Sequence, residues 1–538
     1  MNEELNKALE QISDEHLNEA VGYQHKGFPW LRSIAAVLAL VLAWTAVWAA
    51  FDFKRPIIEP NPDSILQNAP HNSTAPTLPN TLPSPPSEPS FPIAGEPDSP
   101  LPPQDPSVSP PLPGPPIITP PDTSRPLTPL LAQPTYPIMV QCPGKDMNPY
   151  SAEYQQLLHQ WELGKRQQYD QPAGYADSLT EFWYRSMAQF LSGNGNRAFS
   201  PANAYLALAM LAETTGGNTR QQILDLLGAS SIEALRIQVA HLWNAQYCDD
   251  GETTSLLANS LWLDDSYNFT DAIIQRLSEN YFASVYNGDL GSGEMNNLLK
   301  DWINTQTGGL LKEQTDNLEM PANTVFALCS TLYYTAGWRN TFDESRTADA
   351  IFHGTAGDIA TAFMNDTMTG TYYWGSNFGA VRLALTKGYM WLILPDEGYT
   401  VEDILNEDEY LSMALDPNRW KNQKEIILNL SLPKFDISTQ SDLIEGFKEL
   451  GITDVFQSGI ADFSPMTNAD SPYVSQVDHA VRVAIDEEGA MAAAYTVILV
   501  APGSPPPPAD EMDFVLDRPF LFMVTDDVPL FAGVVEQP

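Results

Sequence analysis

Few residues in this chain have the types and spacing that catalysis requires. Ser200 and Ser464 could act as nucleophiles, but neither lies in a Gly-x-Ser-x-Gly setting or has a partnered histidine and aspartate at a recognisable spacing. The three cysteines are scattered, and no Cys-x-x-Cys or His-x-x-x-His pair indicates a metal site. The sequence therefore predicts a protein that is not an enzyme, with no metal and no cofactor.

Residues 489–513 have a composition that suits a strand not yet placed in a sheet. The segment begins with small residues, turns hydrophobic and ends in four prolines, and no charge lies between Gly489 and Ala509. Side chains alternate faces along a strand. One face would carry Ala490, Ala492, Ala494, Thr496, Ile498 and Val500, and the other Met491, Ala493, Tyr495, Val497 and Leu499. Insertion into a sheet would bury no uncompensated charge. The simpler alternative is a strand followed by a loose loop.

The composition excludes one large class of partner. The chain has 538 residues, a formal net charge of -41 and a pI near 4.2. Nucleic-acid binding needs a basic face that displaces counterions, so no nucleic-acid partner is expected.

Four segments follow one another along the chain. Residues 1–32 are polar with one weak helical pattern, and residues 33–51 form an uncharged apolar run of the length that crosses a bilayer. We expect this run to be a retained signal anchor; a cleaved signal peptide is the alternative. The charges flanking it do not fix its orientation. Residues 52–147 are rich in proline and predict a disordered, extended linker, and residues 148–538 have the composition of a folded domain.

The periodicity of the C-terminal domain predicts an α+β fold. Helical patterns cover residues 176–191, 203–214 and 272–281, whereas strand patterns accumulate later. The predicted strands are 326–334, 389–394, 426–432, 480–485, 520–525 and 530–535. Helices followed by strands favour an α+β arrangement over a regular βαβ winding.

Several motifs of this domain resemble the serpin family and occur in the family's order. They are Phe199-Ser200-Pro201, Ala258-Asn259-Ser260-Leu261-Trp262, Leu332-Tyr333-Tyr334 with Gly337-Trp338, Leu432-Pro433-Lys434-Phe435, Ala484-Ile485-Asp486-Glu487-Glu488-Gly489-Ala490 and Arg518-Pro519-Phe520. The resemblance implies a serpin fold with three β-sheets, about nine helices and an exposed reactive-centre loop near the C-terminus.

The resemblance also implies a mechanism. A protease cuts the loop, and the cut loop inserts as a strand into the central sheet and carries the acylated protease with it. The hinge of this loop corresponds to Glu487, Glu488, Gly489, Ala490, Ala492, Ala493 and Ala494. Small hinge residues favour fast insertion, so an inhibitor is expected; a non-inhibitory surface-displayed binding protein or scaffold is the alternative.

The reactive bond follows from the family's spacing after Glu487. That spacing places the bond at Gly503–Ser504, and Val500–Ala501 is the second choice. Both indicate a protease with a small apolar specificity pocket, similar to elastase or subtilisin, because no Arg or Lys lies in the loop.

The resemblance further implies a latch that holds the central sheet shut. The matching positions are Ser200, Ser330, His479 and, near the point of loop entry, Trp338. The family's usual asparagine is replaced by Ser330 and its second early serine by Asn203, which predicts that the latch bonds are rearranged.

Together these observations predict a monomer on the cell membrane. The expected partners are the membrane, through a single N-terminal helix, and extracellular serine proteases. Secretion would follow if the N-terminal segment were cleaved.

Overall fold

The computed structural model describes residues 130–144, 147–148, 150–169, 171–172, 174–316, 318–490 and 510–538. Its α-helices in this part are α3 (Ala152–Tyr169), α4 (Thr180–Leu191), α5 (Pro201–Thr214), α6 (Gly217–Leu226), α7 (Ile232–Gln246), α8 (Asp271–Asn280), α9 (Gly293–Gln306), α10 (Lys312–Thr315), α11 (Val401–Leu405), α12 (Glu409–Leu415) and α13 (Ile444–Glu449). Among the described residues no helix is both long and apolar enough to cross a bilayer. The predicted anchor at 33–51 lies outside this part of the chain.

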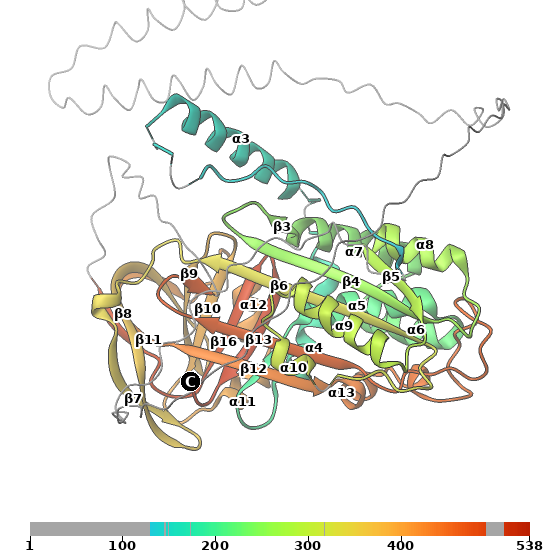
Figure 1. Cartoon of the computed structure of the whole chain (residues 1–538). Helices are drawn as coiled ribbons and strands as arrows, with labels where there is room; N and C mark the ends of the chain where they lie inside the picture. The colour runs from blue at the N-terminus through green and yellow to red at the C-terminus, as the bar shows by residue number, and fades with distance from the viewer. Residues whose placement is uncertain are drawn as a thin grey trace, which may run out of the picture. The chain divides into compact units, whose positions relative to one another are not determined.

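A central sheet forms one layer of the domain (Figure 1). Its strand order is β1-β5-β4-β6-β14-β13-β12, with β3 paired to β4. The bounds are β1 (Leu130–Ala132), β5 (Ala283–Gly288), β4 (Thr254–Asp264), β6 (Phe326–Gly337), β14 (Gly489–Ala490), β13 (Asp478–Ile485), β12 (Phe435–Asp442) and β3 (Cys248–Asp249).

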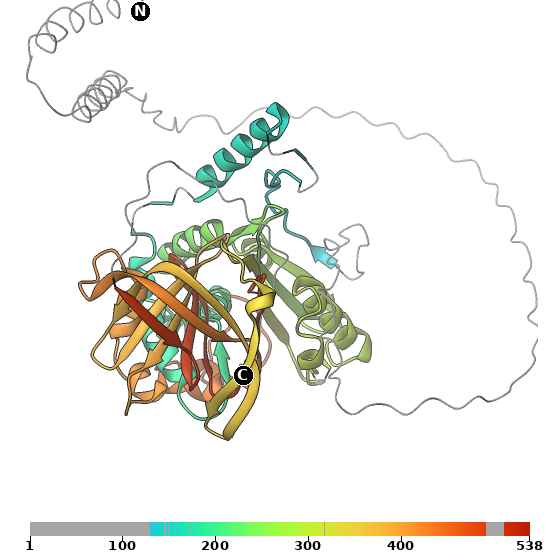
Figure 2. The same ribbon diagram turned by 90° about the vertical axis from the view of Figure 1, so that its left-hand side faces the viewer.

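The remaining strands form a second hydrogen-bonded network, which faces the viewer in Figure 2. Its order is β15-β11-β8-β9-β10-β16-β17-β2, with β7 paired to β8. The bounds are β15 (Glu511–Val515), β11 (Gln423–Pro433), β8 (Gly357–Trp374), β9 (Phe378–Ala384), β10 (Tyr389–Pro395), β16 (Phe520–Asp526), β17 (Val528–Val535), β2 (Arg197–Phe199) and β7 (Ala348–Gly354).

The expected three sheets thus become two networks in the described residues. The cause is β8, whose 18 residues pair with β7 over the first part and with β9 over the last. One long strand therefore joins what the resemblance implies as two separate sheets. The expected count of about nine helices compares with eleven α-helices in the part described, one of them α3, which lies upstream of the motifs that resemble the family.

Helix α5 lies between the two sheets, where it contacts β6 and β17. Its sequence explains both its start and its burial. Ser200 caps the N-terminus by accepting a hydrogen bond from Asn203 N, and Pro201 occupies the first turn, where a missing N–H costs nothing. Small and apolar residues follow, and every residue of the helix except Ala207 is buried. The helix therefore fixes Ser200 and Asn203 beneath the central sheet.

The described residues include some that precede the predicted domain boundary at residue 148. Within the predicted linker, Leu130 pairs with Tyr286 of β5 and adds a short strand to the edge of the central sheet. Tyr136 then stacks on Trp243, with ring centroids 6.0 Å apart. We call residues 130–142 the N-terminal arm. Proline content alone did not reveal it, because single backbone pairings with a distant strand leave no periodic pattern.

The predicted periodic segments are otherwise present. The pattern at 176–191 becomes a short 3-10 turn followed by α4, 203–214 falls within α5, and 272–281 overlaps α8. All six predicted strands are found, as β6, β10, β11, β13, β16 and β17. The α+β fold is confirmed.

Candidate functional site in the central sheet

The candidate site is a gap between two strands of the central sheet. β6 and β13 are both neighbours of β14, and β14 has only two residues. Gly489 pairs with Gly337, and Ala490 pairs with Ala336 on one side and Ile485 on the other. Below this point no described strand lies between residues 326–335 of β6 and 478–484 of β13. We call this space the slot.

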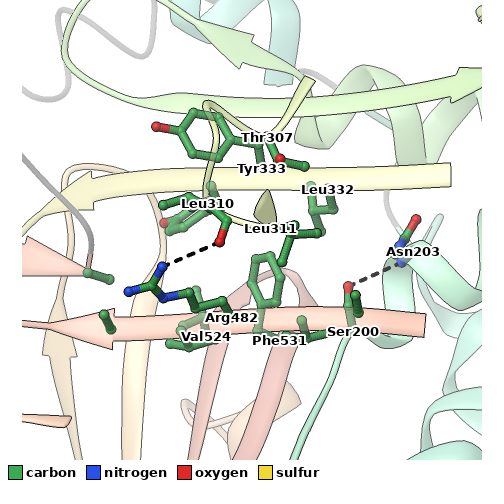
Figure 3. Close-up of a pocket in the computed structure, with 16 residues that line it drawn as sticks. Ser200, Asn203, Thr307, Leu310, Leu311, Leu332, Tyr333, Arg482, Val524 and Phe531 are labelled. Atoms are coloured by element: carbon green, nitrogen blue, oxygen red, sulfur yellow. Dashed lines mark hydrogen bonds between the residues drawn. The ribbon is translucent and has the colours of Figure 1, made fainter. Parts of the chain in front are cut away.

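Side chains leave room along the slot. A cavity of about 650 Å³ lies against the half of β6 farthest from β14, from Phe326 to Leu332. A narrower space continues toward Ala490, between Tyr334 of β6 and Val483 of β13. Figure 3 shows this narrower part, with β6 above and β13 below, and the ring of Phe531 from the second sheet is seen between them in this view. The slot is thus continuous from Phe326, the first residue of β6, to the hinge residues.

A tight turn connects β13 to β14 and positions the first hinge residues. Asp486 Oδ1 accepts hydrogen bonds from Glu488 N at 2.9 Å and Gly489 N at 3.2 Å, and Asp486 N donates to Gly489 O at 3.1 Å. These bonds satisfy the backbone where the chain reverses. The chain is therefore aimed into the slot at Gly489.

Glu487 anchors this turn to the body. Lys434 Nζ lies 2.6 Å from one carboxylate oxygen, and Thr347 Oγ1 donates to the other at 2.7 Å. Burial raises the pKa of Glu487, but the hydrogen bonds from Lys434 and Thr347 outweigh it and leave the pKa below its ordinary value. The side chain is therefore a carboxylate held on two sides. Glu488, in contrast, is exposed.

Trp338 belongs to the hinge rather than to the latch. Its indole N–H donates to Asp486 O at 2.8 Å, and its backbone N donates to Glu488 O at 2.9 Å. The ring is buried and packs edge-on against Phe342. The tryptophan therefore supports the turn from the side of β6.

The other latch residues form a hydrogen-bonded chain beneath the slot. Ser200 N donates to His479 Nε2 at 3.1 Å, which connects α5 to β13. Asn203 Nδ2 donates to Ser330 O at 3.1 Å, and Ser330 Oγ donates back to Asn203 Oδ1, which connects α5 to β6. Asn203 N closes the chain by donating to Ser200 Oγ at 3.4 Å. Asn203 thus belongs to the same hydrogen-bonded chain as Ser200, Ser330 and His479.

His479 is neutral at ordinary pH. It is buried, and this burial lowers its pKa from 6.5 to about 4. An imidazole that accepts from Ser200 N must carry no proton on Nε2, so the hydrogen bond and the lowered pKa agree.

The outer side of the slot is covered by the segment after α9. Arg482 Nη1 of β13 donates to Leu310 O at 3.4 Å, and Gln314 Nε2 donates to Ser438 Oγ of β12 at 2.5 Å. The segment therefore reaches over the slot and bonds to both strands on its far side. These residues could not be identified from the sequence, because nothing in a single sequence pairs Gln314 with a strand more than a hundred positions away.

Several predicted residues lie outside the described part of the chain. They are Ala492, Ala493, Ala494, Val500, Ala501, Gly503 and Ser504. The described hinge residues Glu487, Glu488, Gly489 and Ala490 lie together at one end of the slot, and Ser200, Ser330 and His479 lie near its middle.

Comparisons with known proteins agree with this architecture. Residues 177–538 match the family described as "Serpin (serine protease inhibitor)". Serpin-ZX of Arabidopsis thaliana is 29% identical over 369 residues, covering 65% of this chain and 93% of the relative. Plasminogen activator inhibitor 1 of Bos taurus is 28% identical over 397 residues, covering 68% and 94%.

Solved structures share the fold. The thermophilic serpin tengpin in its native state superposes with a TM-score of 0.61 at 23% identity, covering 69% of this chain and 95% of that one. Thyroxine-binding globulin in complex with thyroxine gives a TM-score of 0.57 at 21% identity, covering 68% and 98%. From the family match over residues 177–538 and the fold it shares with these structures, the chain belongs to the serpin family.

Proposed function

We propose that this protein inhibits serine proteases as a suicide substrate, by cleavage of its reactive loop and insertion of the cut loop into the slot. One observation carries the proposal: at one end of the slot Gly489 and Ala490 already pair with β6, and Ala490 also pairs with β13. Gly489 and Ala490 would then be the first residues of the inserted strand, and the positions that would follow them are open between β6 and β13.

The pairing of Ala490 with β6 and β13 predicts the register in which the rest of the loop would insert. Continuing the antiparallel pairing of Ala490 with Ala336 brings Thr496 opposite Ser330 on β6. The pairing of Ala490 with Ile485 brings the same Thr496 opposite His479 on β13. The even-numbered loop residues would face α5, as Ser330 does, and most of them are small or β-branched. The face of the inserted strand that carries these small and β-branched side chains would then be buried over the latch.

The chemistry is that of an interrupted acyl transfer. The protease serine oxygen attacks the carbonyl carbon of the reactive bond, the C–N bond breaks, and the released amine takes up a proton as a new N-terminus. The loop remains joined to the protease through an ester. Insertion then drags the attached protease across the domain and distorts it, so that hydrolysis of the ester fails.

The length of the slot favours the bond at Gly503–Ser504. Residues 491–500 fill the positions opposite residues 335–326 of β6. Ala501, Pro502 and Gly503 would continue beyond Phe326, the first residue of β6. They would supply a spacer of about 10 Å between the sheet and the acylated carbonyl. Pro502 has no N–H to give to a ladder, so it suits this place. Cleavage at Val500–Ala501 would leave no spacer.

The expected targets are extracellular serine proteases with a small apolar pocket, of the elastase or subtilisin kind. The apolar run at 33–51 supports a place at the cell membrane, with the serpin domain held on the extracellular side. These assignments rest on the sequence of the loop and of the N-terminal segment.

The test is to mix the full chain with pancreatic elastase and with subtilisin, followed by denaturing gels and mass spectrometry. We expect a complex that survives denaturation and a released C-terminal peptide that starts at Ser504. A peptide starting at Ala501 would support the same mechanism, with cleavage at Val500–Ala501 instead. Cleavage without a complex, for these and a wider set of proteases, would overturn the inhibitor proposal in favour of a binding protein.

A further inference from the structure

The chain enters the described domain at the end of the central sheet farthest from the hinge. Leu130 pairs with Tyr286 of β5, Tyr286 pairs with Trp262 of β4, and Trp262 pairs with Ala327 of β6. Ala327 is the second residue of β6, whereas the hinge pairs with the last two. Leu130 therefore lies on the row of residues that crosses the far end of the slot. We call this end the N-terminal pole.

The N-terminal arm runs from this pole toward the hinge. Cys142 N donates to Asp250 O at 2.6 Å, just before β4 begins. The first residue of β4, Thr254, pairs with Thr335, next to the hinge. Figure 1 shows the same direction: the arm passes β5 and α8 on the right and runs toward the left, where β8 and β11 lie. Because Leu130 lies at the N-terminal pole and the arm after it runs toward the hinge, the chain before Leu130 is joined to the domain at this pole.

Insertion of the loop would end at this same pole. In the register set by Ala490, Leu499 comes opposite Ala327, the residue that shares a row with Leu130. The row from Leu130 crosses β5, β4 and β6 before it reaches the slot. Neighbouring strands are about 4.8 Å apart, so Leu130 and the inserted Leu499 would be separated by about 20 Å. A protease of about 220 residues is about 45 Å across.

We infer that trapping needs free space at the point where the chain before Leu130 is joined to the domain, because insertion would end with the protease at this same N-terminal pole. The inference rests on the proposed inhibitory function. The described hinge ends at Ala490, at the opposite end of the slot, so we expect the first attack not to depend on what is attached before Leu130. The last part of insertion does depend on it, because the protease needs free space there.

A spacer upstream of Leu130 is therefore a requirement for trapping and not for cleavage. If a wide surface is fixed close to Leu130, insertion stalls before the protease is distorted, and its catalytic residues remain intact. Water then attacks the ester carbonyl, the loop leaves with a free carboxylate, and the protease serine recovers its proton. The inhibitor is consumed as a substrate.

The experiment uses the full chain with one azide-bearing residue at position 128, two residues before β1. The chain is coupled to a bead either directly or through a flexible spacer on the order of 100 Å long, which clears the diameter of a protease. The same chain free in solution is the reference. Subtilisin is added to each, and two quantities are measured: the rate at which the C-terminal peptide is released, and the fraction of cut chains found in a complex stable to denaturation.

We expect peptide release at similar rates in all three cases. Direct coupling should lower the complexed fraction at least about tenfold, which corresponds to about 1.4 kcal/mol on the insertion barrier, and the spacer should restore it. Equal complexed fractions with and without the spacer would overturn the inference while the inhibitory function stands. Absence of a complex even in solution would instead overturn the proposed function.

Discussion

Asn203 of α5 and Ser330 of β6 exchange two hydrogen bonds beneath the central sheet. The asparagine amide nitrogen donates to the serine carbonyl oxygen at 3.1 Å, and the serine hydroxyl donates to the asparagine side-chain oxygen. The serpin resemblance implies a serine on the helix and an asparagine on the strand, so the two residue types have changed places. The helix-to-strand connection is kept because an amide and a hydroxyl can each both donate and accept.

Ser330→Ala should therefore destabilise the protein by about 1–3 kcal/mol, because it leaves the buried Asn203 oxygen without its donor. Asn203→Ser alone should also destabilise, because a serine is too short to reach the strand. The double variant Asn203→Ser with Ser330→Asn should recover most of the loss. The measurement is the urea midpoint of the four chains. Additive losses in the double variant would show that the pair is not coupled.

His479 should make the protein sensitive to mild acid. Its folded pKa of about 4 lies below the 6.5 of the unfolded chain, so the unfolded state binds the extra proton between these values. The stability contributed by neutral His479 is present above pH 6.5 and falls as the pH drops toward 4. The loss approaches about 3 kcal/mol at the lower end. Urea midpoints measured from pH 7 to pH 4 test this.

The matched control for that titration is His479→Gln, which keeps an acceptor for Ser200 N but cannot be protonated. The variant is expected to be less stable at pH 7 and to lose less stability on acidification. Carboxylates elsewhere titrate in both chains, so the difference between the two pH profiles isolates the histidine. Parallel profiles would contradict the assignment.

Much of the fold could be predicted from the sequence because its elements have strong local patterns. The buried strands β10, β16 and β17 are continuous apolar runs, and α5 starts with a serine cap and a proline. The N-terminal arm could not be predicted in this way. It has two prolines and one three-residue strand, and its place depends on the contacts of Tyr136 with Trp243 and Tyr247, more than a hundred residues away.

The residues of the candidate site also fall into two groups, those that sequence motifs can locate and those that only the folded structure brings together. The family motifs located Glu487, His479 and Trp338, but their partners depend on three-dimensional packing. The partners of Glu487 are Lys434 and Thr347, which lie on different parts of the chain. Spacing to either residue carries no signal, because the two are brought together only when the sheet forms.

Glu487 and Lys434 should be coupled in stability. Glu487→Gln and Lys434→Met each break a charge-assisted hydrogen bond at the hinge, and the double variant should lose less than the sum of the two. A coupling of about 1–3 kcal/mol is expected at pH 7, since Glu487 is almost fully buried. The folded pKa of Glu487 is lowered, so its contribution holds above the ordinary value of 4.5 and is lost as the pH falls below it. A double-mutant cycle of urea midpoints at pH 7 and pH 4 measures both effects.

The last prediction concerns Ala490, which contacts both sides of the slot at its entrance. Ala490→Arg would place a charged side chain at a buried position next to Ala336 and Ile485. Each increase of about 1.4 kcal/mol in the insertion barrier slows insertion tenfold, while hydrolysis of the ester proceeds at its own rate. The variant should be cut by subtilisin as fast as the parent but should form little stable complex.

Glu488→Arg provides the matched control, because it adds the same side chain two residues earlier at an exposed position. It should trap subtilisin as well as the parent does, whereas Ala490→Arg should release cut inhibitor and active protease. Both variants need to be cut at the parent's rate for the comparison to hold. If Ala490→Arg formed as much complex as Glu488→Arg, the loop would not be entering the sheet at Ala490, and the register that places Thr496 over the latch would be wrong.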